Sequence, residues 1–305
     1  MPKKPVNTEI SNDVVKNEVD FFAVSKIFSR AKKQMNLAEW KTFAFALSTI
    51  NFTGEASNKI QLNKRELANA IGITADSRHL SQNLKRSIGD MPLHSYIQID
   101  SEDKEFYESG VVVTGLRMYR NLVTITINPD YMGMFSKCSS DYILMLSNDI
   151  YEMTSDKSPE FYEDLRLHSD TRRTADNPNN RLYTTKQLKD IFGLKESDYM
   201  RAKGGFNRSA FETKVLDVVC EDIRKSKLIN LILQTDSKGK CRYYEKVKKG
   251  GSVIGYRFYW TINNITRKKI ETDSTNIPNT KNQFNRFPQR SYDYADLEKA
   301  LLNKQ

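Results

Sequence analysis

A short pattern occurs twice in this chain, and the repeat limits the folds that the chain can adopt. The first copy reads LNKRELANAIGI (residues 62–73), and the second reads TTKQLKDIFGL (residues 184–194), about 121 residues later. In each copy a polar residue that can cap a helix precedes a lysine, and a glycine follows the last apolar residue. Gly72 and Gly193 mark two helix ends, because glycine readily adopts the left-handed conformation that stops a helix. The chain therefore carries one small helical unit in two places.

The first copy lies within a larger predicted unit. A strand in KIQL leads to Asn63, which caps the first helix, and Asp76 caps a second helix in SRHLSQNLKRSIGDM. On this second helix Leu80, Leu84 and Ile88 recur at helical spacing and face inward. Strands follow in HSYIQID, GVVVTGLRMY and NLVTITIN, and the last two are joined by a tight turn at RN.

The second copy has the same surroundings. It follows a short strand in RLY and precedes a long helix in FNRSAFETKVLDVVCEDIRKSK and a strand in LINLILQT. A hairpin that turns at Gly250-Gly251 completes the unit. A helix-turn-helix followed by a β-hairpin wing is a winged helix. The sequence therefore predicts an α+β protein with two tandem winged-helix domains and a flexible C-terminal tail.

The predicted domain boundaries follow from these units. Helices over Phe21–Lys33 and Leu37–Ile50 open the first winged-helix domain, and the region between the two domains is helical and acidic. The segments are a flexible N-terminus (1–20), the first winged helix (21–140), a linking helical segment (141–170), the second winged helix (171–263), a linker (264–283) and an amphipathic C-terminal segment (284–305).

The C-terminal segment has the pattern of a docking element. Ser291 or Asp293 caps a predicted helix in which Tyr294, Leu297 and Leu301 share one face. A short amphipathic helix on a polar tether is typical of a partner-docking segment. The alternative is that it folds back on the surface of the chain itself.

The charge distribution indicates a polyanionic partner. The chain has a net charge of +10, and residues 201–270 hold 17 Lys or Arg against 6 Asp or Glu, a local net charge of +11. Residues 141–170 hold 2 Lys or Arg against 8 Asp or Glu, a local net charge of −6. A positive charge concentrated on a winged helix favours double-stranded DNA as the partner.

The first turns of the long helix of the second unit are the predicted DNA reader. Phe211, Val215 and Leu216 belong to its buried side, and Asp217 and Glu221 would repel phosphate, so the N-terminal half should face DNA. The predicted contacts on this helix are Asn207, Arg208, Ser209, Thr213 and Lys214. The alternative is that these are ordinary solvated side chains.

The wing of the second unit and the second helix of the first unit supply further predicted contacts. In the wing Lys246 and Lys248 should project together, because alternate strand residues share a face. A charged hairpin edge that merely prevents aggregation is the alternative. In the first unit we expect more backbone contact than base readout. The predicted contacts are Arg242, Lys246, Lys248 and Lys249 in the wing, and Arg78, Gln82, Lys85 and Arg86 in the first unit.

No motif for catalysis or cofactor binding is present. The histidines His79, His94 and His168 form no His-x-His pair, and no P-loop sequence occurs. The three cysteines are far apart and have no metal-site spacing. We therefore expect a binding protein rather than an enzyme, without a cofactor or a metal. No apolar run is long enough to span a membrane, and the N-terminus does not resemble a secretory signal, so we expect a cytoplasmic protein.

Several segments resemble the iteron-binding plasmid replication initiator (Rep) family with tandem winged-helix domains. NLAEWKTFAFAL and IQLNKRELANAIGI resemble its first winged helix, and SPEFYEDLRLH resembles its linking helix. FETKVLDVVCEDIRKSKLINLILQTD and KKGGSVIGYRFYW resemble its second winged helix. The resemblance covers roughly residues 20–263.

This resemblance implies a function. Members of the family bind direct repeats (iterons) at a plasmid origin, help to open an adjacent AT-rich region, and recruit the host initiator and the replicative helicase. The family also implies a monomer–dimer switch, in which dimers form through the first domain, bind an operator and repress synthesis of the protein. The alternatives are a winged-helix transcriptional repressor without an initiation role, and a replisome organiser that acts through protein contacts.

Overall fold

The computed structural model describes residues 21–31, 33–50, 56–75, 78–100, 107–136, 142–202, 204–235 and 239–263. The predicted N-terminal segment 1–20, the cap at Asp76, the linker 264–283 and the docking segment 284–305 lie outside the described residues. Within these ranges, no helix has both the length and the apolar character needed to cross a membrane.

The chain begins with a strand where a helix was expected. β1 (Phe21–Ser25) pairs antiparallel with β7 (Tyr142–Leu146), and α1 (Lys26–Arg30) starts only after Ser25, whose side chain accepts a hydrogen bond from the Phe28 backbone N–H. The prediction of a helix over 21–33 is therefore wrong for its first five residues. A short apolar run does not distinguish a buried strand from a buried helix, and here pairing with a distant strand decides.

The first winged helix contains the predicted three-helix core. α2 (Leu37–Ser48) starts at a capping box formed by Asn36 and Glu39, and it packs on both α3 (Lys64–Ala70) and α4 (Leu80–Ile88). Asn63 caps α3 as predicted, and Gly72 has a φ of +79° beyond its end. α4 begins later than expected, after His79, so Arg78 precedes the helix instead of lying in its first turn.

The strands of the first unit form two small sheets. β2 (Lys59–Asn63), β6 (Leu122–Ile127) and β5 (Val113–Tyr119) form a sheet in the order β2-β6-β5, and the turn between β5 and β6 is the expected tight turn. The run GVVVTGLRMY does not form one strand. Its first residues belong to β4 (Tyr107–Val111), which pairs with β3 (Tyr96–Asp100), and the rest forms β5. The remaining elements are α5 (Met91–His94) and the 3-10 helix η1 (Pro129–Met134).

The linking region contains a strand and two helices. Residues 142–146 are β7, so the expectation of a helical segment from residue 141 is wrong at its start, whereas α6 (Ser147–Glu152) and α7 (Ser158–Leu167) confirm the helices. α7 packs on α1 of the first unit, on β7, and also on α8 (Thr185–Ile191) and α10 (Asp217–Arg224) of the second unit. α7 therefore packs on the helices of the second unit in the same way as α2 packs on the helices of the first unit.

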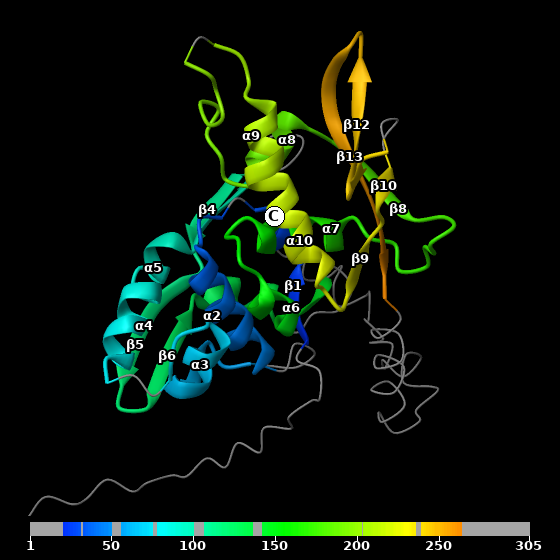
Figure 1. Ribbon diagram of the computed structural model, residues 1–305. Helices are drawn as coiled ribbons and strands as arrows, with labels where there is room; N and C mark the ends of the chain where they lie inside the picture. The colour runs from blue at the N-terminus through cyan, green and yellow to red at the C-terminus, as the bar shows by residue number, and fades with distance from the viewer. Residues whose placement is uncertain are drawn as a thin grey trace, which may run out of the picture. The chain divides into compact units, whose positions relative to one another are not determined.

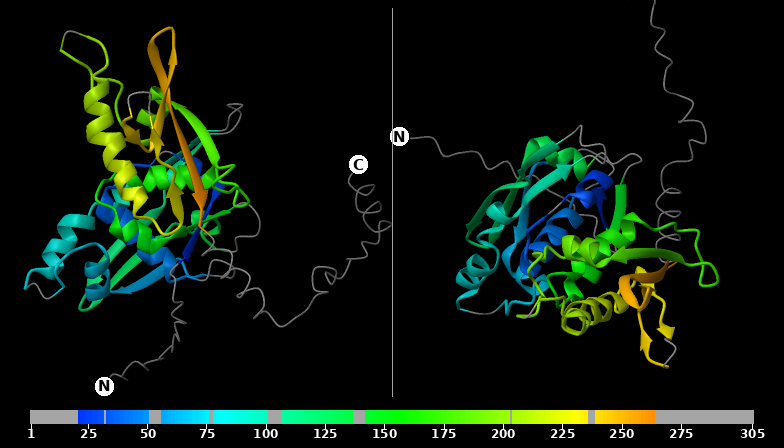
Figure 2. Two further views of the ribbon diagram at one scale, coloured as in Figure 1. Left: turned by 45° about the vertical axis from the view of Figure 1, so that its right-hand side comes forward. Right: turned by 90° about the horizontal axis from the view of Figure 1, so that it is seen from above.

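The second winged helix repeats the plan of the first (Figures 1 and 2). A capping box of Thr184 and Gln187 starts α8, and Gly193 with a φ of +61° follows its end. The long helix is continuous but changes its winding, through α9 (Arg208–Phe211), a π-helical turn η2 (Glu212–Leu216) and α10. The strands are β8 (Asn179–Thr184), β9 (Ile229–Leu231), β10 (Gln234–Thr235), β11 (Cys241–Arg242), β12 (Tyr244–Lys249) and β13 (Ser252–Ile262).

The sheet of the second unit has the order β12-β13-β8, and β9 also pairs with β13. The expected strand over LINLILQT is interrupted, since its two ends belong to β9 and β10. Each unit has an aromatic core, around Phe28, Phe43 and Phe135 in the first and around Phe161 and Phe258 in the second.

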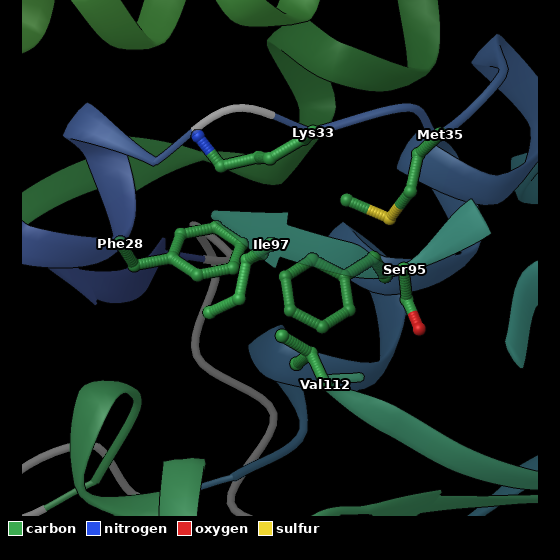
Figure 3. A pocket seen from close by; sticks show the side chains of 7 residues that line it. Phe28, Lys33, Met35, Ser95, Ile97 and Val112 are labelled. Carbon is green, nitrogen blue, oxygen red and sulfur yellow. The ribbon is translucent and has the colours of Figure 1, made fainter. Parts of the chain in front are cut away.

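A small pocket lies beside the first aromatic core (Figure 3). The Lys33 ammonium group lies 4.6 Å from the centre of the Phe28 ring, and Met35, Ile97 and Val112 complete the walls. The space between these side chains leaves no room for a water molecule, so it is part of the packed core and not a ligand site.

Candidate nucleic-acid interface

The long helix of the second unit has one buried side and one exposed side. Phe211, Val215 and Leu216 are buried as predicted, and so are the later apolar residues of that side. Ser209, Thr213 and Lys214 are exposed on the first two turns. Asn207 is the N-cap, and its side-chain oxygen accepts a hydrogen bond from the Ala210 backbone N–H at 3.4 Å. The predicted buried side of the helix is therefore confirmed, and the N-terminal half of the helix presents polar side chains to solvent.

Arg208 lies between the helix and the wing. Its Nη2 atom donates to the Val253 carbonyl oxygen of β13 at 3.5 Å, close to the limit of a hydrogen bond. Its Nε atom is buried and has no hydrogen-bond partner in the described part of the chain. A guanidinium group has five N–H donors, so Arg208 keeps donors for an external acceptor.

Glu212 connects the helix to the wing. Its carboxyl is only 5% exposed and accepts from Lys246 Nζ at 2.6 Å, Arg242 Nη1 at 3.2 Å and the Tyr256 hydroxyl at 3.2 Å. Arg242 also lies 3.5 Å from the Asp217 carboxylate, to which the Tyr244 hydroxyl donates at 2.9 Å. Both acidic groups come from the helix and both cations come from β11 and β12, so the ion pairs fix the hairpin against the helix.

Two of the wing cations that are predicted to contact DNA take part in these ion pairs. Arg242 and Lys246 are directed at carboxylates of the same chain, with side chains 14% and 32% exposed. Lys246 and Lys248 therefore do not act as one outward pair. Sequence reasoning placed Lys246 on the outer face by strand alternation alone, and it did not weigh Glu212 as the partner.

The tip of the wing carries the remaining cations. Lys248 and Lys249 are exposed, and the residues that the structure describes give them no ion pair or hydrogen bond through the side chain. Gly250 and Gly251 form the turn, with φ values of +55° and +81°. Two consecutive positive φ angles are typical of a two-residue hairpin turn and require glycine or asparagine. Figures 1 and 2 show the hairpin of β12 and β13 projecting on the same side of the molecule as α9.

Two tyrosine hydroxyls of this network remain protonated donors. Burial and the neighbouring Asp217 carboxylate raise the pKa of Tyr244, and burial and Glu212 raise the pKa of Tyr256. In the neutral pH range both hydroxyls therefore donate to the carboxylates and add no charge to the interface.

In the first unit the predicted contacts are all exposed. Arg78, Gln82, Lys85 and Arg86 face solvent from α4 or from the turn before it. Lys64 is buried at 7% exposure, and its ammonium group donates to Ser81 Oγ at 3.1 Å and to the carbonyl oxygen of Arg120. The tip of the hairpin between β5 and β6 is thereby held against the start of α4.

That hairpin tip carries residues that sequence reasoning missed. Arg117 and Arg120 lie 5.9 and 5.2 Å from the centre of the Tyr119 ring, which is 56% exposed. The alternation of Arg117 and Tyr119 in the predicted strand could have placed them on one face. The hairpin therefore adds an exposed cationic and aromatic surface to that of α4.

The two units are joined by buried carboxylates. Asp222 of α10 is 4% exposed and accepts four hydrogen bonds, from the backbone and hydroxyl of Thr154, the Ser155 backbone and the Ser158 hydroxyl. Asp149 of α6 accepts from the Tyr162 hydroxyl at 3.0 Å and from the Lys227 backbone at 2.8 Å. Both ends of α10 are therefore fixed, by the wing on one side and by the linking helices on the other.

The described ranges contain no group of three or more His, Cys, Asp or Glu residues that could hold a metal ion. His94 and His168 each pair with a single carboxylate, that of Glu39 and that of Asp164. Burial raises the pKa of the Cys220 thiol, which makes this cysteine a core residue rather than a nucleophile.

Two helix-turn-helix units, each with a β-hairpin and an exposed polar face, define the tandem winged-helix class of DNA-binding proteins. Two family models match the chain: "Initiator Replication protein, WH1" over residues 22–166 and "Initiator Rep protein, WH2" over residues 184–260. Together these matches span most of the chain. The chain therefore belongs to the initiator Rep protein family, which is a DNA-binding family and not a classical enzyme family.

One solved structure shares the fold. The chain is similar to the Pi initiator protein in the crystal structure of its complex with iteron DNA, with a TM-score of 0.59 and 14% sequence identity over 81% of this chain and 99% of that one. A structure of domains 2 and 3 of RctB gives a TM-score of 0.39 at 14% identity, over 74% of this chain and 82% of that one. A comparison with curated proteins gives no match.

Proposed function

We propose that this protein is a plasmid replication initiator that binds direct repeats at its origin and acts in the cytoplasm. The observation that carries the proposal is that the second unit exposes Ser209, Thr213 and Lys214 on its long helix and Lys248 and Lys249 at the tip of its wing. Membership of the Rep family and the fold shared with an initiator that binds iterons support the same reading.

The mechanism follows from the geometry of the two units. The start of the long helix enters a major groove, and Arg208 and Lys214 contact base edges there, with Asn207, Ser209 and Thr213 as shorter partners. Lys248 and Lys249 contact phosphates that flank the groove. In the first unit α4 contacts the backbone of the next groove through Arg78, Gln82, Lys85 and Arg86.

The later steps of initiation belong to the same proposal. The bound protein promotes opening of the origin and recruits the host initiator or helicase-loading proteins, and its dimer represses its own gene. The segment 284–305 serves as the docking element for a host protein. A chain that lacks residues 284–305 should bind repeats normally and fail to support plasmid replication, and replication by this shortened chain would refute the docking role.

Binding to DNA upstream of the gene tests the proposal. Fluorescence anisotropy of the full chain should show tighter binding to a duplex with the natural upstream repeats than to a shuffled duplex of the same composition. Arg208→Ala should cost about 1–3 kcal/mol on the repeats and much less on the shuffled duplex, because it removes a base contact. Equal losses on both duplexes would show that Arg208 contacts only phosphate. A single operator without repeats would favour a repressor over an initiator.

A further inference from the structure

The DNA-facing half of the long helix contains a carboxylate that binds two cations of the wing. Glu212 lies between Arg208 and Lys214 in sequence, within the π-helical turn, and it faces the hairpin. Its carboxyl oxygens accept from Lys246, Arg242 and the Tyr256 hydroxyl, and each of the three contacts is 3.2 Å or shorter. π-Turns within α-helices are frequent at functional sites, where the extra residue redirects a side chain.

The exposures of the partners show why these ion pairs resist competition. The Glu212 side chain is 5% exposed, and those of Arg242 and Lys246 are 14% and 32% exposed. Charges attract each other more strongly when they are shielded from water. A phosphate that drew either cation away would leave a buried carboxylate with fewer partners, which is strongly unfavourable.

The lysines at the tip of the hairpin differ in this respect. Lys248 and Lys249 are exposed, and no carboxylate in the described ranges pairs with them. The four predicted wing contacts are therefore of two kinds: Arg242 and Lys246 pair with carboxylates, and Lys248 and Lys249 at the tip have no such partner in the described ranges.

We infer that Glu212 is a specificity-determining residue that withholds Arg242 and Lys246 from phosphate. The inference rests on the proposed binding of duplex DNA. It explains how the protein would distinguish the repeat sequence from other DNA. Phosphate contacts strengthen binding to any sequence, whereas base contacts distinguish sequences. By neutralising two cations beside the groove, Glu212 lowers the sequence-independent part of the affinity. The same ion pairs hold the hairpin in a fixed position relative to the reading helix.

A charge-only substitution tests this role. Glu212→Gln keeps the shape of the side chain and removes the carboxylate charge that pairs with Lys246 and Arg242, although Arg242 still has Asp217 as a second partner at 3.5 Å. Anisotropy titrations of the full chain on a repeat duplex and on a shuffled duplex, each at a series of salt concentrations, give the slope of log K against log salt. We expect Glu212→Gln to steepen the slope by about 0.9–1.8, the value for one or two added phosphate contacts. Affinity for the shuffled duplex should rise about 3- to 10-fold at low salt, and the ratio of repeat to shuffled affinity should fall.

The matched control is Glu221→Gln, which makes the same charge change on an exposed residue of the same helix. It should leave the slope unchanged. An equal steepening in both variants would show an effect of net charge alone and would overturn the inference, as would an unchanged slope in a folded Glu212→Gln protein.

Substitution of the partner lysine keeps the inference testable if Glu212→Gln fails to fold. Lys246→Met in the otherwise natural chain should leave the slope unchanged, because Lys246 does not contact phosphate. In the Glu212→Gln background, the same substitution should reduce the slope by about 0.9. A reduction of that size in the natural chain would overturn the inference. If the natural chain binds neither duplex, the proposed function itself fails, and that result is distinct from every outcome above.

Discussion

Replacing Asp222 by alanine should destabilise the protein more than any exposed substitution on the same helix. The Asp222 carboxylate accepts two backbone N–H groups and two hydroxyl groups at distances of 2.7–2.9 Å. These donors lie in the turn between α6 and α7 and at the first residue of α7, so the carboxylate fixes α10 to the linking helices. Lys41 is buried nearby, and although burial lowers its pKa, the charge of Asp222 opposes that shift.

The magnitude follows from the donors that would lose their acceptor. A hydrogen bond to a charged group contributes about 1.5–3 kcal/mol to stability. A donor that stays buried without its acceptor destabilises the protein by its full desolvation penalty. Thr154 is exposed and can bind water instead, whereas Ser158 is fully buried and cannot. We therefore expect Asp222→Ala to lower the free energy of unfolding by about 3–5 kcal/mol, which is less than the sum of four separate bonds.

Urea denaturation of the full chain, followed by circular dichroism and tryptophan fluorescence, measures this loss. The control is Glu221→Ala on the adjacent residue, whose exposed ion pair with Arg224 is worth at most about 0.5 kcal/mol. A loss below about 1 kcal/mol for Asp222→Ala, with an unchanged denaturant slope, would refute the view that this carboxylate holds the two helices together.

Three other substitutions give direct tests. Burial raises the pKa of Glu160 from 4.5 to about 8, so the stability that depends on its protonated form is full below pH 4.5 and is lost as the pH rises towards 8. Glu160→Gln, which stays neutral, should therefore stabilise the protein by up to about 4 kcal/mol at pH 8 and by less than about 1 kcal/mol at pH 5 in thermal unfolding. Gly255→Ala should destabilise the protein by more than about 2 kcal/mol, because a Cβ atom at this position would lie 2.3 Å from the Tyr183 carbonyl oxygen. The control is Gly115→Ala, whose Cβ atom would lie 3.6 Å from the nearest atom, and it should cost less than about 1 kcal/mol in the same assay. Lys248→Ala should reduce the salt slope of DNA binding by about one on any sequence, and an unchanged slope would remove the tip of the wing from the interface.

Local sequence signals predicted much of the fold. Capping residues and glycines identified both helix-turn-helix units, because these residues start or end the helix directly beside them. They are Asn63, Thr184, Gly72 and Gly193. The hairpin turn at Gly250-Gly251 was equally local. The strand β1 was missed, since pairing with β7 about 120 residues away decides its conformation and no local signal reports such a partner.

The exposed face of the long helix was predictable from the sequence, whereas its electrostatics were less so. Helical periodicity identified the exposed face that carries Ser209, Thr213 and Lys214. It did not show that Glu212 turns towards the wing, because a regular wheel does not account for a π-turn and the partners Arg242 and Lys246 lie 30 and 34 residues away. The net charge therefore included two cations, Arg242 and Lys246, that already form ion pairs within the folded chain.

A hydroxyl-radical footprint of the purified chain on the DNA upstream of its gene tests the central claim, which is that two winged helices of one chain read a duplex together. The account predicts protected stretches of backbone that flank two successive major grooves on one face of each repeat, about one helical turn apart. Arg208→Ala should weaken one of these patches and leave the other. A single protected groove per chain, or the same protection on shuffled DNA, would contradict the account.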